Sequence, residues 1–395
     1  MPEPKKRGTK RLLLALVLMY AAFTLIPAAV YGASHLGTAG KGPESGASAS
    51  ADSASGTASA PESAPASESS AAQESAPSSP PSTEAPAENA SSVPGFLDDL
   101  PLSSQSKGTA EETFILYDAA TGRVFSVSTE EFLPAALACE MDLSAPKEAL
   151  KAQAVAIYTL YSRQRETGEA AVHGADFACD SENWLFYVPK EAMQERWGED
   201  FEEHYSLLQE VAQEVSGQLL TREGKPICAA YFAISAGSTE AAENVWGGES
   251  GSFPYLQAVA SPGDRLSDGY LSTAVLTEEE FREAASTAFS EDPPDLSGPA
   301  EDWLREVERT PSGYVKSAVL GGKTVSGPDL RAAFSLRSAC FQPVYENGAF
   351  TFTVRGWGHG VGMSQAGAVF LAKQGADYRE ILAHYYPGAA LTSPA

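Results

Sequence analysis

Basic side chains are scarce in this chain of 395 residues, in which 27 Lys and Arg stand against 52 Asp and Glu. The formal net charge at pH 7 is therefore −25. A surface that binds nucleic acid or another anionic polymer needs a clear excess of Lys and Arg. The composition thus argues against nucleic acid as a partner, and it is compatible with a soluble domain.

Cysteine is also scarce. The chain has four cysteines, at Cys139, Cys179, Cys228 and Cys340. Four thiols would allow two disulfides in an oxidising compartment, but their spacings are not those of a small disulfide-bonded scaffold. A chain of this length can bury a hydrophobic core without such cross-links. We therefore expect free thiols.

An apolar run from Leu12 to about Val30 is long enough to span a bilayer. Lys and Arg residues precede it within residues 1–11, so this flank should stay in the cytoplasm and the rest of the chain outside. A cleaved signal peptide is the alternative, and the small residues around 31–35 agree with it. The length of the run favours an uncleaved, single-pass anchor at 12–30.

Residues 31–108 consist mainly of Ser, Ala, Pro, Gly and Glu, with almost no large apolar side chains. Such a segment cannot bury enough surface to offset its ordering entropy, so we expect a disordered tether. Residues 109–395 would then form the extracytoplasmic domain. This length allows a large single domain or two lobes.

The folded region mixes helical and strand patterns without βαβ repeats. Alternating apolar residues around Thr121 and Gly122 predict a β-hairpin. A capping box at Ser128–Glu131 predicts a helix that ends near Glu140, and Pro146 opens a second helix. Further helices are expected at 190–214 with a break at Gly198, within 276–307, at 364–373 and from 377, and further strands at 218–221, 227–234, 315–320 and 350–354. The predicted fold class is α+β, with mixed helices and antiparallel strands in two lobes and a groove between them.

A glycine-rich motif near the C-terminus reads Arg-Gly-Trp-Gly-His-Gly-Val-Gly-Met-Ser-Gln, residues 355–365. Its alternating glycines leave one backbone face without side chains, so a ligand can approach closely. Trp357 offers a flat apolar surface, and His359, Ser364 and Gln365 offer hydrogen-bonding groups, a combination that suits sugar rings. The glycine offsets match neither a dinucleotide fingerprint nor a P-loop. A turn packed against a helix is the alternative that the motif alone leaves open.

This motif, followed by His-Tyr-Tyr-Pro-Gly at 384–388, resembles the C-terminal signature of the stage II sporulation protein D family, which also includes amidase enhancers. Three further segments resemble the family in the same order, at 146–156, 231–256 and 325–338. The resemblance covers roughly residues 112–391. It implies a domain that acts on the glycan strands of peptidoglycan.

Glu140 lies at the end of the first predicted helix, beside Met141 and other apolar residues. An exposed glutamate is the simpler interpretation of these residues alone. A carboxyl among apolar groups instead has a raised pKa and can act as a general acid at a glycosidic oxygen. The resemblance favours the second interpretation, because Glu140 matches the catalytic glutamate of the family's Gly-Glu-Met-Pro motif. Cys139 and Asp142 replace the glycine and the proline, and the charge of Asp142 would raise the pKa further.

The resemblance also implies a mechanism in which one glutamate serves first as acid and then as base. In sporulation members of the family, the acid protonates the bond between MurNAc and GlcNAc. The carboxylate then deprotonates the sugar's own 6-hydroxyl, which leaves a 1,6-anhydro-MurNAc end. No water has to be activated, so no second carboxylate is required.

Lys151 and Tyr158 are seven residues apart on the second predicted helix, nearly two turns, so they share one face. The resemblance places Lys151 in the substrate site, whereas Tyr158 stands where the family has an arginine. A tyrosine keeps a hydroxyl and a stacking face but lacks the charge and the bidentate donors of arginine. The predicted substrate-binding residues are Lys151, Tyr158, Trp357, His359, Ser364 and Gln365.

Some members of the family carry zinc on a His-x5-Cys-x5-Cys arrangement after the second helix. His173 and Cys179 match the first two positions, but Leu185 occupies the third. Stable zinc sites use three or four ligands, so zinc would need a nearby carboxylate such as Asp176 or Asp180. A buried cysteine and a hydrogen-bonded histidine that shape the loop are the preferred interpretation.

The predicted function is that of a membrane-anchored lytic transglycosylase that acts in engulfment during sporulation. Its partners would be peptide-free glycan strands and an amidase that first removes the stem peptides. The reaction requires no cofactor. Two alternatives remain, namely a non-catalytic, glycan-binding enhancer of an amidase and a structural protein that tethers wall glycan. The retained Glu140, Lys151 and glycine motif favour the enzyme.

Overall fold

A computed structural model describes residues 113–248 and 251–393. The predicted cytoplasmic tail, membrane anchor and tether, at 1–11, 12–30 and 31–108, lie outside the described residues. Within the described ranges, no helix combines the length and the apolar character needed to cross a membrane. The anchor and the domain boundaries therefore stay predictions.

The described chain begins with the predicted hairpin, formed by the antiparallel strands β1 (Thr113–Asp118) and β2 (Arg123–Ser128). β3 (Phe177–Cys179) pairs in parallel with the other edge of β1. Alternate side chains of β1 are buried, and Phe114 packs on Phe132 of α2 (Thr129–Glu140), with ring centroids 4.8 Å apart. Ser128 caps α2 by accepting the backbone N–H of Glu131, as the sequence predicts.

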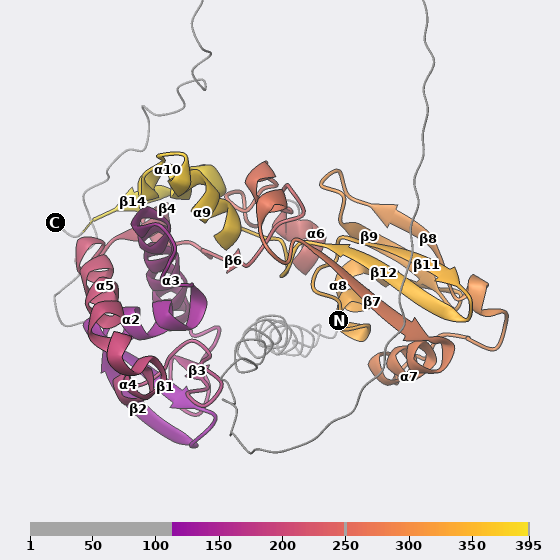
Figure 1. Ribbon diagram of the computed structural model, residues 1–395, viewed down its shortest axis with the longest axis horizontal. Coiled ribbons are helices and arrows are strands. Elements are labelled where there is room, and N and C mark those ends of the chain that lie inside the picture. Colours follow the sequence, from indigo (N-terminus) through magenta and orange to yellow (C-terminus); the bar gives the residue numbers. More distant parts are fainter. Residues whose placement is uncertain (1–112, 249–250, 394–395) are drawn as a thin grey trace, which may run out of the picture. The chain divides into compact units, whose positions relative to one another are not determined.

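α3 (Lys147–Thr167) is the central helix of the first hydrophobic cluster (Figure 1). Apolar residues fill most of its circumference between 149 and 160, and it packs against α2, α5, α9 and α10. The helix begins after Pro146 and ends at Gly168, which adopts φ 65°. The other helices of this cluster are α4 (Lys190–Trp197), α5 (Phe201–Glu214), α9 (Gln365–Lys373) and α10 (Tyr378–Tyr385). A short 3₁₀ turn that begins at Gly198 separates α4 from α5, as predicted.

The C-terminal segment of the chain returns to this first cluster. β14 (Ala390–Thr392) pairs with β4 (Leu219–Arg222), which also pairs with β5 (Lys225–Pro226). β13 (Met363–Ser364) runs parallel to β6 (Tyr231–Phe232), shortly before α6 (Ala242–Trp246). Residues around 114–256 and 361–391 thus share one core.

The segment between these parts forms a second hydrophobic cluster from two antiparallel three-stranded sheets. One sheet has the order β10-β9-β8 and the other β11-β12-β7. Its elements are β7 (Leu271–Thr277), α7 (Glu278–Ala288), η3 (Ala300–Asp302), β8 (Leu304–Arg309), β9 (Val315–Leu320), β10 (Lys323–Ser326), α8 (Gly327–Ala333), β11 (Phe341–Glu346) and β12 (Ala349–Arg355). The short helix η2 (Pro262–Leu266) precedes them and packs against α9 of the first cluster. Phe281 and Phe350 stack at its centre, 4.0 Å apart.

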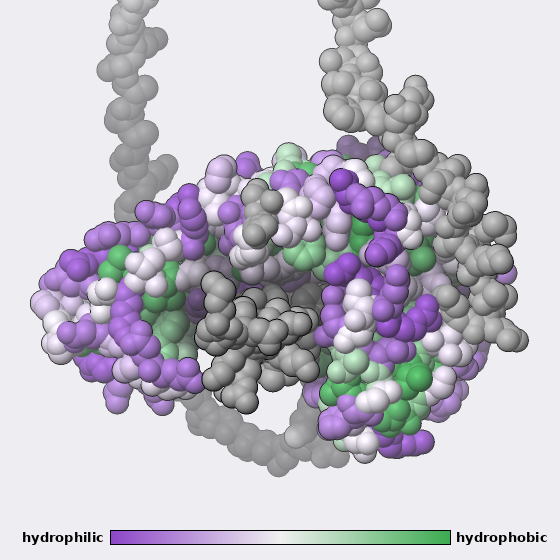
Figure 2. Space-filling model, turned by 180° about the vertical axis from the view of Figure 1, so that it is seen from behind, coloured by the Kyte–Doolittle hydropathy of each residue, from purple (hydrophilic) through white to green (hydrophobic). Residues whose placement is uncertain are grey.

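The described residues confirm the α+β class with mixed helices and antiparallel strands. The groove between two lobes stays a prediction. Two strands replace part of the helix expected within 276–307, since β7 ends at Thr277 and β8 begins at Leu304. The strand expected at 227–234 is shorter, because only Tyr231 and Phe232 form it. Hydrophilic residues cover much of the face of the molecule in Figure 2, and hydrophobic residues gather in smaller areas.

Candidate active site

The carboxyl of Glu140 lies among protein atoms at the end of α2, where Met141 leaves the helix in an extended conformation. Desolvation raises the pKa of this carboxyl to about 7. Hydrogen bonds from the side chains of Tyr231 and Gln365 act in the opposite direction, because they stabilise the carboxylate. Asp142, which we expected to contribute, does not cause the shift, and its carboxylate accepts the backbone N–H of Ser144 instead. The half-buried Glu140 is therefore a carboxylic acid that titrates near neutral pH.

Tyr231 reaches Glu140 from β6, and Gln365 reaches it from the helix that follows the neighbouring strand β13. Tyr231 pairs with Met363 in the parallel β6–β13 ladder, and Gln365 follows directly after β13 as the first residue of α9. The amide of Gln365 also donates to the backbone carbonyl of Glu140 at 3.1 Å. Tyr231 lies in a segment that resembles the family, but no functional role was predicted for it from the sequence. Nothing in local spacing signals this contact, since it depends on how β6 pairs.

The glycines of the 355–365 motif let the chain pack closely against itself. Gly362 has φ 80°, and a Cβ there would lie 1.9 Å from the backbone oxygen of Ala230. A Cβ on Gly356 would lie 2.6 Å from the oxygen of Ile234, and Trp357 exchanges two backbone hydrogen bonds with Ile234. The space that we expected a ligand to enter beside these two glycines is thus occupied by backbone on either side of β6, at Ala230 and Ile234.

The other predicted substrate contacts of this motif are buried against protein groups. Only 9% of Trp357 is exposed, and the guanidinium of Arg337 lies 4.3 Å from its ring centroid. Burial lowers the pKa of His359 to about 3, so its imidazole is neutral at physiological pH. Ser364 is fully buried and donates to the carboxylate of Asp264 at 2.6 Å. Their roles toward a substrate stay predictions, whereas Gln365 lies in contact with Glu140.

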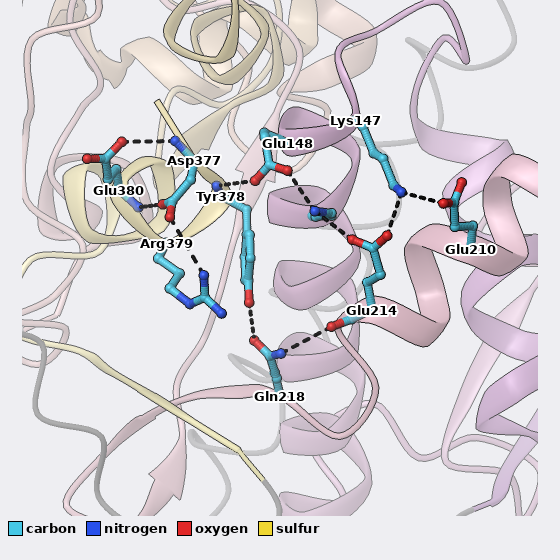
Figure 3. A network of polar contacts seen from close by, with 10 residues as sticks. Lys147, Glu148, Glu210, Glu214, Gln218, Asp377, Tyr378, Arg379 and Glu380 are labelled. Atoms are coloured by element: carbon cyan, nitrogen blue, oxygen red, sulfur yellow. Dashed lines mark hydrogen bonds and ion pairs between the residues drawn. The ribbon is translucent and has the colours of Figure 1, made fainter. Parts of the chain in front are cut away.

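Lys151 and Tyr158 lie in different environments although they share a helix face. The ammonium of Lys151 is 2.6 Å from carboxylate oxygens of both Glu148 and Glu214. Figure 3 shows these two glutamates in the polar network that also includes Lys147. Tyr158 is 4% exposed and packs edge-on against Phe114 in the core. Neither residue contributes to the shifted pKa of Glu140. The structure therefore shows Lys151 in an ion-pair network between α3 and α5.

The residues of the predicted zinc arrangement do not converge. The exposed ring of His173 packs on Tyr117, with centroids 4.3 Å apart, whereas Cys179 pairs with Asp118, whose side chain faces the core. Adjacent residues of a strand face opposite sides, so the imidazole and the thiol lie on opposite faces of this sheet. Burial raises the pKa of Cys179 to about 12, and Leu185 is buried. In the described part of the chain, no three His, Cys, Asp or Glu side chains are grouped to hold a metal ion.

Comparison with known proteins connects this site to a family. The model of the family described as "Stage II sporulation protein" matches residues 117–221, a range that begins before Glu140 and ends within β4. Stage II sporulation protein D of Bacillus amyloliquefaciens is 34% identical over 279 residues, which cover 70% of this chain and 78% of that protein. The Bacillus subtilis (strain 168) protein of the same name is 33% identical over 278 residues, with the same coverage. The amidase enhancer of Bacillus subtilis (strain 168) is 28% identical over 228 residues, which cover 46% of this chain and 32% of that protein.

Proposed function

Because the chain belongs to the stage II sporulation protein D family, we propose that it is a lytic transglycosylase that cleaves peptide-free glycan strands of peptidoglycan during sporulation. Family membership supports a cell-wall role in sporulation. The carboxyl of Glu140, whose pKa of about 7 lies near neutral pH, supports the catalytic step. Residues 12–30 would anchor the enzyme in the membrane, with the domain outside and a cell-wall amidase as partner.

The pKa of Glu140 suits a group that must both give and take a proton. A general acid-base catalyst is most effective when its pKa lies near the working pH. The protonated carboxyl would donate to the oxygen between MurNAc and GlcNAc as the bond to the MurNAc anomeric carbon breaks. The carboxylate would then accept the proton of the MurNAc 6-hydroxyl as that oxygen bonds to the anomeric carbon. The neutral donors on Tyr231 and Gln365 would hold the carboxylate in place during the second step.

Peptide-free glycan strands incubated with the full chain test this proposal. Mass spectrometry would follow 1,6-anhydro-MurNAc ends in the wild type and in Glu140→Gln, with Glu195→Gln as the control. Glu195 is an exposed glutamate of α4, so its variant should retain activity. Products from the wild type and the control, but not from Glu140→Gln, would support the enzyme. Glycan binding without any products would refute it.

A second candidate function is the enhancement of a cell-wall amidase without cleavage. The core position of Tyr158, where the family has an arginine, favours this candidate, as does the similarity to an amidase enhancer. The two functions differ in their dependence on Glu140. An enhancer would stimulate a purified amidase on intact peptidoglycan equally well as wild type and as Glu140→Gln.

A further inference from the structure

The carboxylate of Asp264 is fully buried and accepts hydrogen bonds from three separate segments of the chain. Its Oδ2 accepts the backbone N–H of Ser235 and the hydroxyl of Ser364, each at 2.6 Å. Its Oδ1 accepts the hydroxyl of Ser261 at 2.9 Å. A buried carboxylate costs free energy unless such bonds compensate for lost water. These donors therefore hold Asp264 in place, and it holds them in return.

Two of these donors lie at corresponding ends of the β6–β13 pair. Ser235 comes three residues after β6, and Ser364 is the last residue of β13 and the N-cap of α9. One carboxylate oxygen of Asp264 thus joins the two strands at the ends where they leave the ladder. Tyr231 is part of β6, and Gln365 directly follows β13. The side chains of these two residues donate hydrogen bonds to Glu140.

The first turn of α9 rests directly on this network. A Cβ on Gly367 would lie 1.9 Å from the hydroxyl of Tyr385, 2.3 Å from that of Ser261 and 2.7 Å from Oδ1 of Asp264. The hydroxyls of Ser261 and Tyr385 are 2.7 Å apart, which connects the network to α10. The start of α9, and with it the backbone of its first residue, therefore has little freedom to move relative to Asp264.

We propose that Asp264 is a positioning residue for Glu140, which fixes the Tyr231 hydroxyl and the Gln365 amide by bridging β6 and β13. The role rests on the proposed function, because it orients the carboxyl assigned there as acid and base. Asp264 itself touches no reacting atom in this scheme. The simpler interpretation is that it only stabilises the fold, and the two interpretations differ in what they predict for the titration of Glu140.

The titration of Glu140 can be followed without any turnover. The full chain, labelled with ¹³C at the glutamate Cδ, would be titrated by NMR, with the Glu140 resonance assigned by its loss in Glu140→Gln. In Asp264→Asn, the hydrogen bonds that lower the pKa of Glu140 weaken, so this pKa should rise by about half a unit to one unit. Asp329→Asn is the control for the same change of residue elsewhere. The exposed Asp329 also accepts a 2.6 Å hydrogen bond from a serine hydroxyl, that of Ser326, but it lies in α8 of the second cluster.

A rise in Asp264→Asn, with none in Asp329→Asn, supports the positioning role. A folded Asp264→Asn that keeps the wild-type pKa of Glu140 overturns it, even if the variant is less stable. Should Asp264→Asn fail to fold, Ser364→Ala keeps the carboxylate and removes its bond to the start of α9. An unchanged Glu140 pKa in that variant would overturn the role equally. A shifted pKa in a protein that cleaves no glycan would support the positioning contact and refute only the proposed function.

Discussion

Replacement of Glu140 by glutamine should stabilise the protein at high pH while it removes activity. The folded pKa of about 7 lies about 2.5 units above the ordinary value of 4.5. The folded state therefore binds the proton more tightly than the unfolded chain, and wild-type stability falls as the pH rises through this window. At about 1.36 kcal/mol per unit, ionisation of Glu140 costs about 3 kcal/mol once the pH exceeds 7. Glutamine avoids this cost because it does not ionise.

Urea denaturation of the full-length wild type and Glu140→Gln at two pH values measures the effect. Between about pH 5.5 and about pH 8, the difference in unfolding free energy should move by about 2 kcal/mol in favour of the variant. Both conditions lie above the isoelectric point of this acidic chain. If the glutamine amide lacks a hydrogen-bond partner, the variant loses the same free energy at both pH values. The change in the difference between the two pH values is therefore unaffected. The exposed Glu195→Gln serves as control. A pH-independent difference for Glu140→Gln would refute the raised pKa.

Three further substitutions, one of them with a paired control, test contacts that the structure shows. Tyr231→Phe removes a hydrogen bond that lowers the pKa of Glu140. The alkaline limb of the plot of glycan cleavage against pH should therefore move to higher pH, and a limb that does not move would contradict this contact. Gly362→Ala should destabilise the protein by more than about 3 kcal/mol in urea denaturation, because positive φ and a backbone clash combine. Gly375→Ala, with positive φ and open space, should cost only about 1 kcal/mol, and equal losses would refute the clash. Tyr158→Arg should lower the free energy of unfolding by about 3 kcal/mol or more in urea denaturation, because it buries an unpaired cation. A variant as stable as the wild type would show that this position can open to water.

Elements with local signals could be predicted from the sequence. The cap at Ser128 sets the start of α2, Gly198 separates α4 from α5, and Asp377 and Glu380 form the capping box that opens α10. β7 was not predicted from the sequence. Its outward face carries exposed apolar residues, so the strand lacks the alternation of apolar and polar residues that would indicate it. The outward apolar side chains of this strand are Leu271 and Val275, 61% and 62% exposed.

The site was predicted only as far as its chemistry depends on neighbours in sequence. Glu140 has apolar neighbours on its own helix, which is why a raised pKa could be inferred. Tyr231 contacts Glu140 although the two residues lie far apart in the chain. The ladder that places Tyr231 pairs only two residues of each strand, which is too short to leave a pattern in the sequence. The glycines of the motif indicate that something approaches the backbone closely. They do not reveal whether that partner is a ligand or, as at Gly362, another part of the chain.

Lys151 and Tyr158 show that residues on the same face of a helix can lie in different environments, which their spacing in the sequence does not reveal. α3 passes from a surface with carboxylates into an aromatic core, so one face meets both environments. Glu148 and Glu214 neutralise Lys151, and the tyrosine at 158 carries no charge at neutral pH. A cation in contact with a carboxylate typically lowers its pKa by 1–3 units, whereas Glu140 accepts its hydrogen bonds from a neutral phenol and a neutral amide. Those neutral donors orient the carboxylate and leave its pKa near 7, where one group can serve as both acid and base.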